Sequence, residues 1–451
     1  MNLEATKRII QLNPVNATSS GVYAPSSGLP LIKFDISSFD NTTFLDCKNL
    51  RISGKITYKI PNGTAPLQGS ASFVDGFCGT FGNCIDHLTV SSKRLNSVLE
   101  RITNYSRMVP SVVSALHDED SIYGELSHQG GHHPTTYLAR NLVVARKDED
   151  PGATTSGSKG ITFSAPLYAG IFQAGQKLDV SKGGTGGLVV EILLKPNVSV
   201  CFGSDAAAAV SLVQYEISDL QLSCPIYEMP TAGNQTSFSF NSITSVFQTI
   251  NSSASVIALT PGLSRVSGVF MNMTNTSEIG NQAHNSCRLG NMGELRQVRF
   301  SQNGILRPLQ YRLQTNEEVN NNLIQGGSLN FERDRNMVDR NYLEAVNVNS
   351  ARDISATSLA HNKWWSGVRN RNQTANSGGK SIGTAQGIGI LYDQFGTGEN
   401  FSENVFSVEF ELDGTTDNGL DGTAATSQGV YMFFLNKQTL IMDGSGISVQ
   451  K

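Results

Sequence analysis

The chain of 451 residues is unusually poor in charge, with only 16% charged side chains and 44 glycines, whereas an average soluble domain is roughly 25% charged. This composition excludes long coiled coils and favours many strands joined by long loops. The net charge of −4 excludes the strongly basic surface of a dedicated nucleic-acid-binding protein. Hydrophobic residues make up 39% of the chain, which is enough for packed cores.

The first residues contain no apolar run long enough for a secretory leader, so we expect synthesis in the cytosol. Arg8 precedes two apolar residues, Ile9 and Ile10, and the pattern predicts a short helix over Thr6–Leu12. Because so short a helix is marginal in water, we expect residues 1–30 to form an N-terminal arm that docks on a neighbouring molecule.

Strand-like segments recur along the whole chain and are separated by loops rich in Gly, Ser, Thr and Asn. Some alternate apolar and polar residues, as half-buried strands do, and others are short apolar runs. The predicted strands are Leu50–Ile60, Ile161–Phe172, Leu188–Leu194, Val210–Ile217, Phe238–Ile243, Val266–Met273, Phe406–Leu412 and Val430–Ile441.

Helical patterns are few. Leu95, Val98, Leu99 and Ile102 follow the spacing of one helix face, which predicts a helix over residues 93–105. A weaker pattern predicts a second helix over Arg335–Val348.

The two halves of the chain resemble each other. Arg51–Gly54 reappears as Arg265–Gly268, and Val190–Leu194 corresponds to Val408–Leu412, at offsets of about 214 and 218 residues. Several elements in one order at nearly constant offset indicate an internal duplication, with the boundary near Pro230–Gln235.

Each half then carries about eight strands, which is the strand number of a jelly roll built from two packed antiparallel sheets. The sequence therefore predicts an all-β fold of two tandem eight-stranded jelly-roll sandwiches, with few short helices in loops. We assign residues 1–30 to the arm, 31–230 to the first jelly roll and 236–451 to the second.

No constellation of catalytic or metal-binding residues stands out. His128, His132 and His133 lie beside Gly130 and Gly131, which disfavour the helix that would align the imidazoles on one face. Cys78 and Cys84 lie too far apart, with no second pair, for a typical zinc site. We therefore expect no enzymatic activity, no metal and no cofactor.

The only two tryptophans, Trp364 and Trp365, lie between Lys363 and Arg369. Aromatic residues among basic ones can stack on single-stranded nucleic acid. Tryptophan is also favoured at subunit contacts, and we interpret this pair as an anchor in a core or at a subunit interface.

At the level of pattern, the chain resembles the double jelly-roll major capsid proteins of adenoviruses and tailless phages, and is most similar to those of virophages and polinton-like viruses. The resemblance spans about Leu31 to Val449. The segments that carry it are Gly82–Val90 with the residues up to Tyr105, Ile161–Phe172, Leu178–Val180, Gly187–Leu194, Val298–Gln310 with its Asn303-Gly304 turn, Val405–Leu412 and Gly429–Met442.

The resemblance implies a homotrimer whose six jelly rolls make a pseudo-hexagonal capsomer of an icosahedral viral capsid. It implies that the chain is made and assembled inside the host cell and becomes part of the virion. Its partners would be itself, neighbouring capsomers, penton and other minor capsid proteins and an internal membrane, but no sequence-specific nucleic acid. The candidate assembly contacts are Arg8, Ile9, Ile10, Trp364 and Trp365.

Two other functions stay open from the residues alone. One is a carbohydrate-binding β-sandwich protein or a glycosidase, which would favour clustered surface aromatics and a paired carboxylate. The other is a minor virion or appendage protein.

Overall fold

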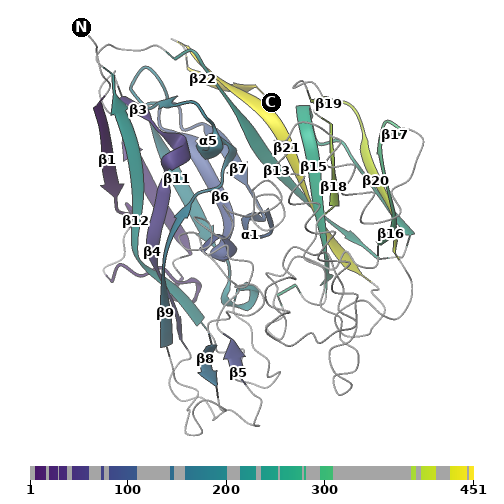
Figure 1. Ribbon diagram of the computed structural model, residues 1–451, viewed down its shortest axis with the longest axis horizontal. Coiled ribbons are helices and arrows are strands. Elements are labelled where there is room, and N and C mark those ends of the chain that lie inside the picture. Colours follow the sequence, from purple (N-terminus) through teal and green to yellow (C-terminus); the bar gives the residue numbers. More distant parts are fainter. Residues whose placement is uncertain are drawn as a thin grey trace, which may run out of the picture.

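The computed structural model describes residues 6–16, 20–28, 30–37, 43–59, 73–75, 81–108, 143–146, 158–200, 214–229, 235–251, 254–276, 279–280, 295–307, 388–392, 398–412, 427–443 and 446–450. These residues form antiparallel sheets in two bodies that lie side by side (Figure 1). The predicted helix at Arg335–Val348 lies outside the described residues. Within the described part of the chain, no helix is long and apolar enough to span a membrane.

The first body packs a six-stranded sheet against a four-stranded one. In the larger sheet, β1 and β4 pair with the same residues of β12, Leu222 and Ser223, so they lie on opposite sides of it. The larger sheet contains β1 (Thr6–Leu12), β12 (Gln214–Glu228), β4 (Arg51–Lys59), β9 (Ser158–Pro166), β3 (Thr43–Leu45) and β10 (Leu178–Asp179); the smaller one contains, in order, β2 (Leu31–Ser37), β11 (Gly187–Leu194), β6 (Ile85–Ser92) and β7 (Val98–Ile102).

The second body repeats this arrangement. Its larger sheet runs β13 (Ser237–Ile250), β21 (Gln428–Met442), β15 (Leu263–Asn275), β18 (Ile388–Leu391), with β19 (Glu399–Phe401) and β22 (Ile447–Gln450) attached; its smaller sheet runs β14 (Ala254–Leu259), β20 (Phe406–Leu412), β16 (Leu295–Gln302), β17 (Ile305–Arg307). In both bodies the chain visits the two sheets in the same sequence, which is the connectivity of a jelly roll. The predicted all-β fold of two tandem jelly rolls is confirmed, and β4 and β15 occupy equivalent strands.

The remaining elements are short. A separate two-stranded sheet pairs β5 (Phe73–Asp75) with β8 (Val143–Arg146), and the α-helices among the described residues are α1 (Tyr105–Met108) and α5 (Gly170–Gln173). Single 3-10 turns occupy Pro25–Ser27, Cys47–Asn49, Phe81–Cys84 and Asn197–Ser199.

Three predicted elements are wrong in type or length. Thr6–Leu12 is a strand and pairs with β12 over its whole length, so these residues are an edge strand of the first roll and not a free helical arm. The predicted helix at residues 93–105 is a turn followed by β7. The predicted strand Ile161–Phe172 ends at Pro166, and α5 follows. The boundary between residues 230 and 236 stays a prediction.

The hairpin between β16 and β17 turns through Asn303 and Gly304, whose φ angles are 48° and 79°. Two consecutive positive φ angles are typical of a type I′ turn, for which Asn-Gly is the preferred pair. We expect Gly304→Ala to lower the free energy of unfolding by about 1 kcal/mol, because alanine is strained at positive φ. Urea denaturation beside Gly175→Ala, where a new methyl group meets nothing within 4 Å, checks this; equal stability of the two variants would contradict it.

Candidate assembly interface

The candidate contacts Arg8, Ile9 and Ile10 all lie on β1, which pairs with β12 along one edge. The Arg8 guanidinium lies 3.3 Å from the Glu228 carboxylate. Ile10 packs against the core of the first roll, whereas the Ile9 side chain is 63% exposed. Of the two isoleucines, Ile9 is therefore the one that the described surface leaves available for a contact.

Basic side chains surround the neighbouring aromatic ring. The Lys177 Nζ atom lies 4.2 Å from the centre of the Tyr227 ring, and Lys7 Nζ lies 5.8 Å from it. Such cation–π contacts add a modest stabilisation at exposed sites and hold this end of β1 against β12. Trp364 and Trp365 lie outside the described residues, and their role as contacts stays a prediction.

The structure also contains an extensive interface between the two rolls of one chain, whose residues were not identified from the sequence. The apolar residues of the first roll form one continuous cluster, here called the first core, which also includes side chains of the second roll. A second core fills the inside of the second roll. The side chains that the second roll contributes to the first core are Phe238, Phe240, Ile243, Phe270, Tyr431, Phe433, Leu435, Leu440 and Met442.

Strand β21 separates the two cores. Tyr431, Phe433 and Leu435 belong to the first core, and the alternating Val430, Met432 and Phe434 belong to the second. A strand that is buried on both faces reads as a continuous apolar run, which explains the unbroken apolar segment from Val430 to Leu435.

A buried carboxylate crosses this interface. Glu100 of β7 is 4% exposed, and its oxygens accept hydrogen bonds from the backbone N–H groups of Gly170 at 3.0 Å, Ile171 at 2.9 Å and Ile243 at 3.3 Å. Burial raises the pKa of Glu100, and these donors together with the Ser242 hydroxyl offset only part of the effect. One side chain thereby ties β7, α5 and the second roll's β13 together.

Other polar contacts join the rolls at the margins of this interface. The Ser245 hydroxyl donates to the Thr103 carbonyl oxygen at 2.8 Å, and the Arg94 guanidinium donates to the Asp443 carbonyl oxygen at 2.9 Å. The buried Arg107 guanidinium lies 5.3 Å from the centre of the Tyr431 ring. Polar and charged groups therefore border an apolar centre that is rich in aromatic residues, as in stable protein–protein interfaces.

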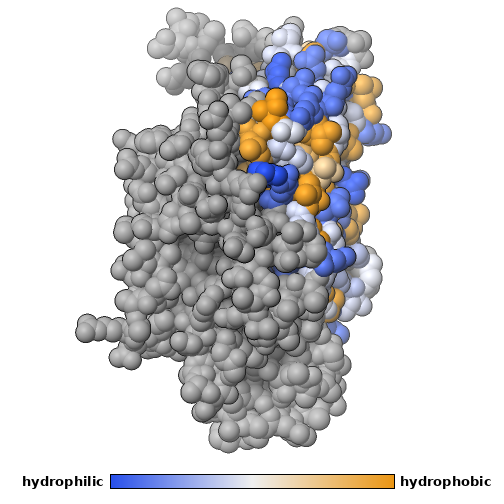
Figure 2. Space-filling model, turned by 90° about the vertical axis from the view of Figure 1, so that its right-hand side faces the viewer, coloured by the Kyte–Doolittle hydropathy of each residue, from blue (hydrophilic) through white to orange (hydrophobic). Residues whose placement is uncertain are grey.

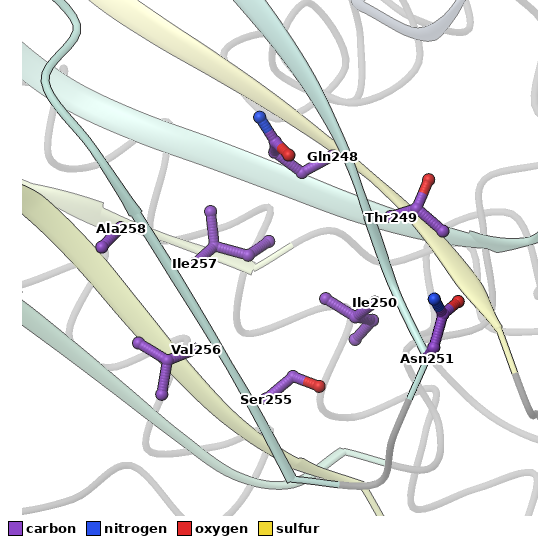
Figure 3. A pocket seen from close by; sticks show the side chains of 8 residues that line it. All are labelled: Gln248, Thr249, Ile250, Asn251, Ser255, Val256, Ile257 and Ala258. Atoms are coloured by element: carbon purple, nitrogen blue, oxygen red, sulfur yellow. The ribbon is translucent and has the colours of Figure 1, made fainter.

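The free side of the second roll has a different character (Figure 2). Hydrophobic and hydrophilic side chains are interspersed there, and Ile305 of β17 is 52% exposed. An open groove of about 460 Å³ lies between Gln248–Asn251, at the end of β13, and Ser255–Ala258 of β14. Figure 3 shows Ile250 and Ile257 between the two diverging strands.

Chemistry other than packing is sparse in the described part of the chain, where no group of three His, Cys, Asp or Glu side chains lies close enough to hold a metal ion. Cys47, Cys84 and Cys224 are buried free thiols. Burial raises the pKa of Cys224 to about 12, so this thiol stays protonated and packs as a small apolar group.

No protein-family model and no curated protein sequence matches the chain. Solved structures do match it. The Sputnik virophage structure aligns over 100% of this chain and 89% of the matched chain, with a TM-score of 0.56 and 12% identity. The Faustovirus major capsid protein aligns over 98% and 91%, with a TM-score of 0.55 and 9% identity.

The capsid of the virus PBCV-1 aligns over 100% of this chain and 98% of the matched chain, with a TM-score of 0.52 and 11% identity. These matches span both rolls and the connection between them. The chain therefore has the double jelly-roll fold that is found in major capsid proteins of icosahedral viruses.

Proposed function

We propose that this protein is a major capsid protein that associates as a homotrimer, whose six rolls form a pseudo-hexagonal capsomer of an icosahedral shell. The fold and the matches to capsid proteins over both rolls support this function. They favour it over a carbohydrate-binding protein, a glycosidase or a minor virion protein. Its role is structural rather than enzymatic, and its place is the virion.

The contact between the two rolls is the observation that supports the trimer. It joins different surfaces, because β7 and α5 of the first roll meet β13 and β21 of the second. A head-to-tail contact of this kind generates a ring when its rotation closes. In the second roll β17 corresponds to β7, and in the first roll β1 corresponds to β13. If the same contact formed between chains, β17 of one copy would therefore meet β1 of the next copy.

The finer partners follow from the same proposal. Capsomers of this kind meet neighbouring capsomers, penton and other minor capsid proteins, and an internal membrane, and the chain would be made and assembled inside the host cell. The basic side chains Lys7, Arg8 and Lys177 at one end of β1 suit an anionic surface, although Arg8 is paired with Glu228. Sequence-specific binding to nucleic acid is not part of the proposal.

Ile9 and Ile305 test the trimer. We expect wild-type protein to have three times the mass of one chain in light scattering at micromolar concentration. Ile9→Asp and Ile305→Asp should each shift the protein to monomers, because each would place a charge in a contact between copies. Val198→Asp is the matched control, since Val198 is also exposed at 37% but lies on neither strand.

Monomeric wild-type protein, or trimers that tolerate both aspartates, would contradict this arrangement. Electron microscopy of the concentrated protein then tests shell formation separately, because shells built from trimers are the outcome that distinguishes a capsid protein from another trimeric β-protein.

A further inference from the structure

The two rolls differ at the outer edge of the smaller sheet: other residues of the chain hydrogen-bond to this edge in the first roll, but no described residue does so in the second. In the first roll, the chain leaves β1 and runs along the outer edge of β2. The Val15 N–H donates to the Lys33 carbonyl oxygen at 2.7 Å. The Asn16 carboxamide donates to the Leu31 carbonyl oxygen at 2.7 Å and accepts from the Lys33 N–H at 2.9 Å. The outer edge of β2 is therefore closed by Val15 and Asn16.

The corresponding edge of the second roll is that of β14. Phe34 of β2 lies opposite Val190, and Ile257 of β14 lies opposite Val408. Counting back one residue, Lys33 lies opposite Glu191 and Val256 lies opposite Glu409. Val256 is therefore the counterpart of Lys33, and Ala254 is the counterpart of Leu31.

The backbone groups of Val256 point away from the sheet. The Asn303 N–H donates to the Val405 carbonyl oxygen at 2.9 Å, which identifies this pair as hydrogen-bonded. Hydrogen-bonded pairs alternate along an antiparallel ladder, so Arg299 and Glu409 are also such a pair. Glu409 directs its groups to β16, and Val256 opposite it directs its N–H and C=O to the outer edge of β14.

Among the described residues, nothing pairs with this edge, since β14 pairs with β20 alone. Strand β13 runs without interruption from Ser237 to Ile250. None of its residues crosses to the smaller sheet to pair with its edge, as Val15 and Asn16 do in the first roll. The result is the open groove between β13 and β14, beside which Val256 is 62% exposed. The roll–roll interface reaches Ser245 of β13, three residues before the groove lining begins at Gln248.

We propose that the outer edge of β14 is a docking site for an extended segment of a different polypeptide, which adds a strand there. An asparagine of that segment donates to the Ala254 carbonyl oxygen and accepts from the Val256 N–H, as Asn16 does on β2. Main-chain pairing gives such strand addition its affinity, and side chains give it specificity. The chain's own Val15 and Asn16 are engaged on β2 and do not close the edge of β14, so we assign the added strand to another protein.

A synthetic peptide tests the site. A fluorescein-labelled peptide with the sequence of residues 12–19 carries the Val-Asn pair, and its anisotropy is measured with folded full-length protein. We expect saturable binding of one peptide per chain. Replacing the asparagine of the peptide by alanine should weaken binding at least tenfold, and this comparison needs no change in the protein.

Val256→Pro in the protein should also weaken binding at least tenfold. Proline removes the outward N–H and is tolerated at edge positions whose N–H faces solvent, so the fold is retained. Val256→Thr is the matched control, because it keeps the N–H and should bind as wild type does.

Several outcomes would overturn the proposal. They are absence of binding up to roughly millimolar peptide, binding that is insensitive to Val256→Pro, and binding that is insensitive to the asparagine. Self-association of the wild-type chain that Val256→Pro abolishes would overturn it as well, since the occupant would then be a second copy. The peptide-binding measurements do not depend on whether the protein forms trimers.

Discussion

Gly170→Ala is expected to separate the two rolls or to prevent folding. A Cβ atom at residue 170 would lie 1.9 Å from the carbonyl oxygen of Asn241 and 2.5 Å from its carbonyl carbon. Both atoms belong to the backbone of β13, so no side chain can rotate away, and the helix α5 must move from the second roll. Overpacking of this kind costs about 3 kcal/mol.

Gly175→Ala is the control for this prediction, because the same methyl group two residues beyond α5 meets nothing within 4 Å. Urea denaturation measures the difference in unfolding free energy, and hydrogen exchange at β13 shows whether the rolls have parted. Equal stability of the two variants would contradict the close approach of α5 to β13.

Glu100→Ala is expected to destabilise the protein by about 2–4 kcal/mol, because it leaves buried backbone donors of both rolls without an acceptor. Gly170, Ile171 and Ile243 all lose their partner. Relief of the carboxylate's own desolvation offsets part of the loss. Equilibrium unfolding measures the change, and a variant as stable as wild type would show that the carboxylate does not join the rolls.

Glu100→Gln separates the charge from the hydrogen bonds. Burial raises the pKa of Glu100 in the folded protein, so the folded state holds this proton more firmly than the unfolded state. The contribution of Glu100 to the free energy of unfolding therefore falls as the pH rises from the ordinary carboxyl pKa of the unfolded state to the raised pKa of the folded state. At pH values above the folded-state pKa this contribution no longer changes with pH. Glu100→Gln should remove this part of the pH dependence, and an unchanged pH profile of unfolding would contradict the raised pKa.

Strands whose sequence pattern matches their surroundings were predictable. Phe406–Leu412 coincides with β20, where Phe406 and Val408 are buried and Ser407 and Glu409 face outward. The segment from Val430 to Ile441 was also predictable as a strand, although its burial between two cores was not. An apolar run indicates that a strand is buried on both faces, but it does not identify the elements that pack against those faces.

The error at residues 93–105 has a physical cause. Strand β7 is covered by its own roll on one face and by the second roll on the other, so Leu99 and Glu100 are both buried while Val98 is 53% exposed. This breaks the alternation of a half-buried strand and imitates helical spacing. The helix prediction therefore fails because the second roll covers the face of β7 that would face solvent in an isolated roll.

Thr6–Leu12 was predicted as a helix because its strand partner lies far away in the sequence. A short segment with adjacent isoleucines is ambiguous between helix and strand. Its hydrogen-bond partner is β12, which begins at Gln214, and no local signal indicates a partner so remote. Glu100 and Gly170 escaped notice for the same reason, since their partners Ile243 and Asn241 belong to the other roll.

The first core has a consequence for how the chain folds during synthesis. The last strand of the first roll ends at Glu228, yet Leu440 and Met442 also belong to its core, roughly 200 residues further along. Domains of a nascent chain usually fold one after another from the N-terminus. In this chain the first roll leaves the ribosome before β21 is synthesised, so the apolar residues that β21 covers are still exposed. A nascent chain halted before β21 should therefore bind chaperones and be cleaved readily by proteases. Expressing the first roll alone would reproduce that stalled state.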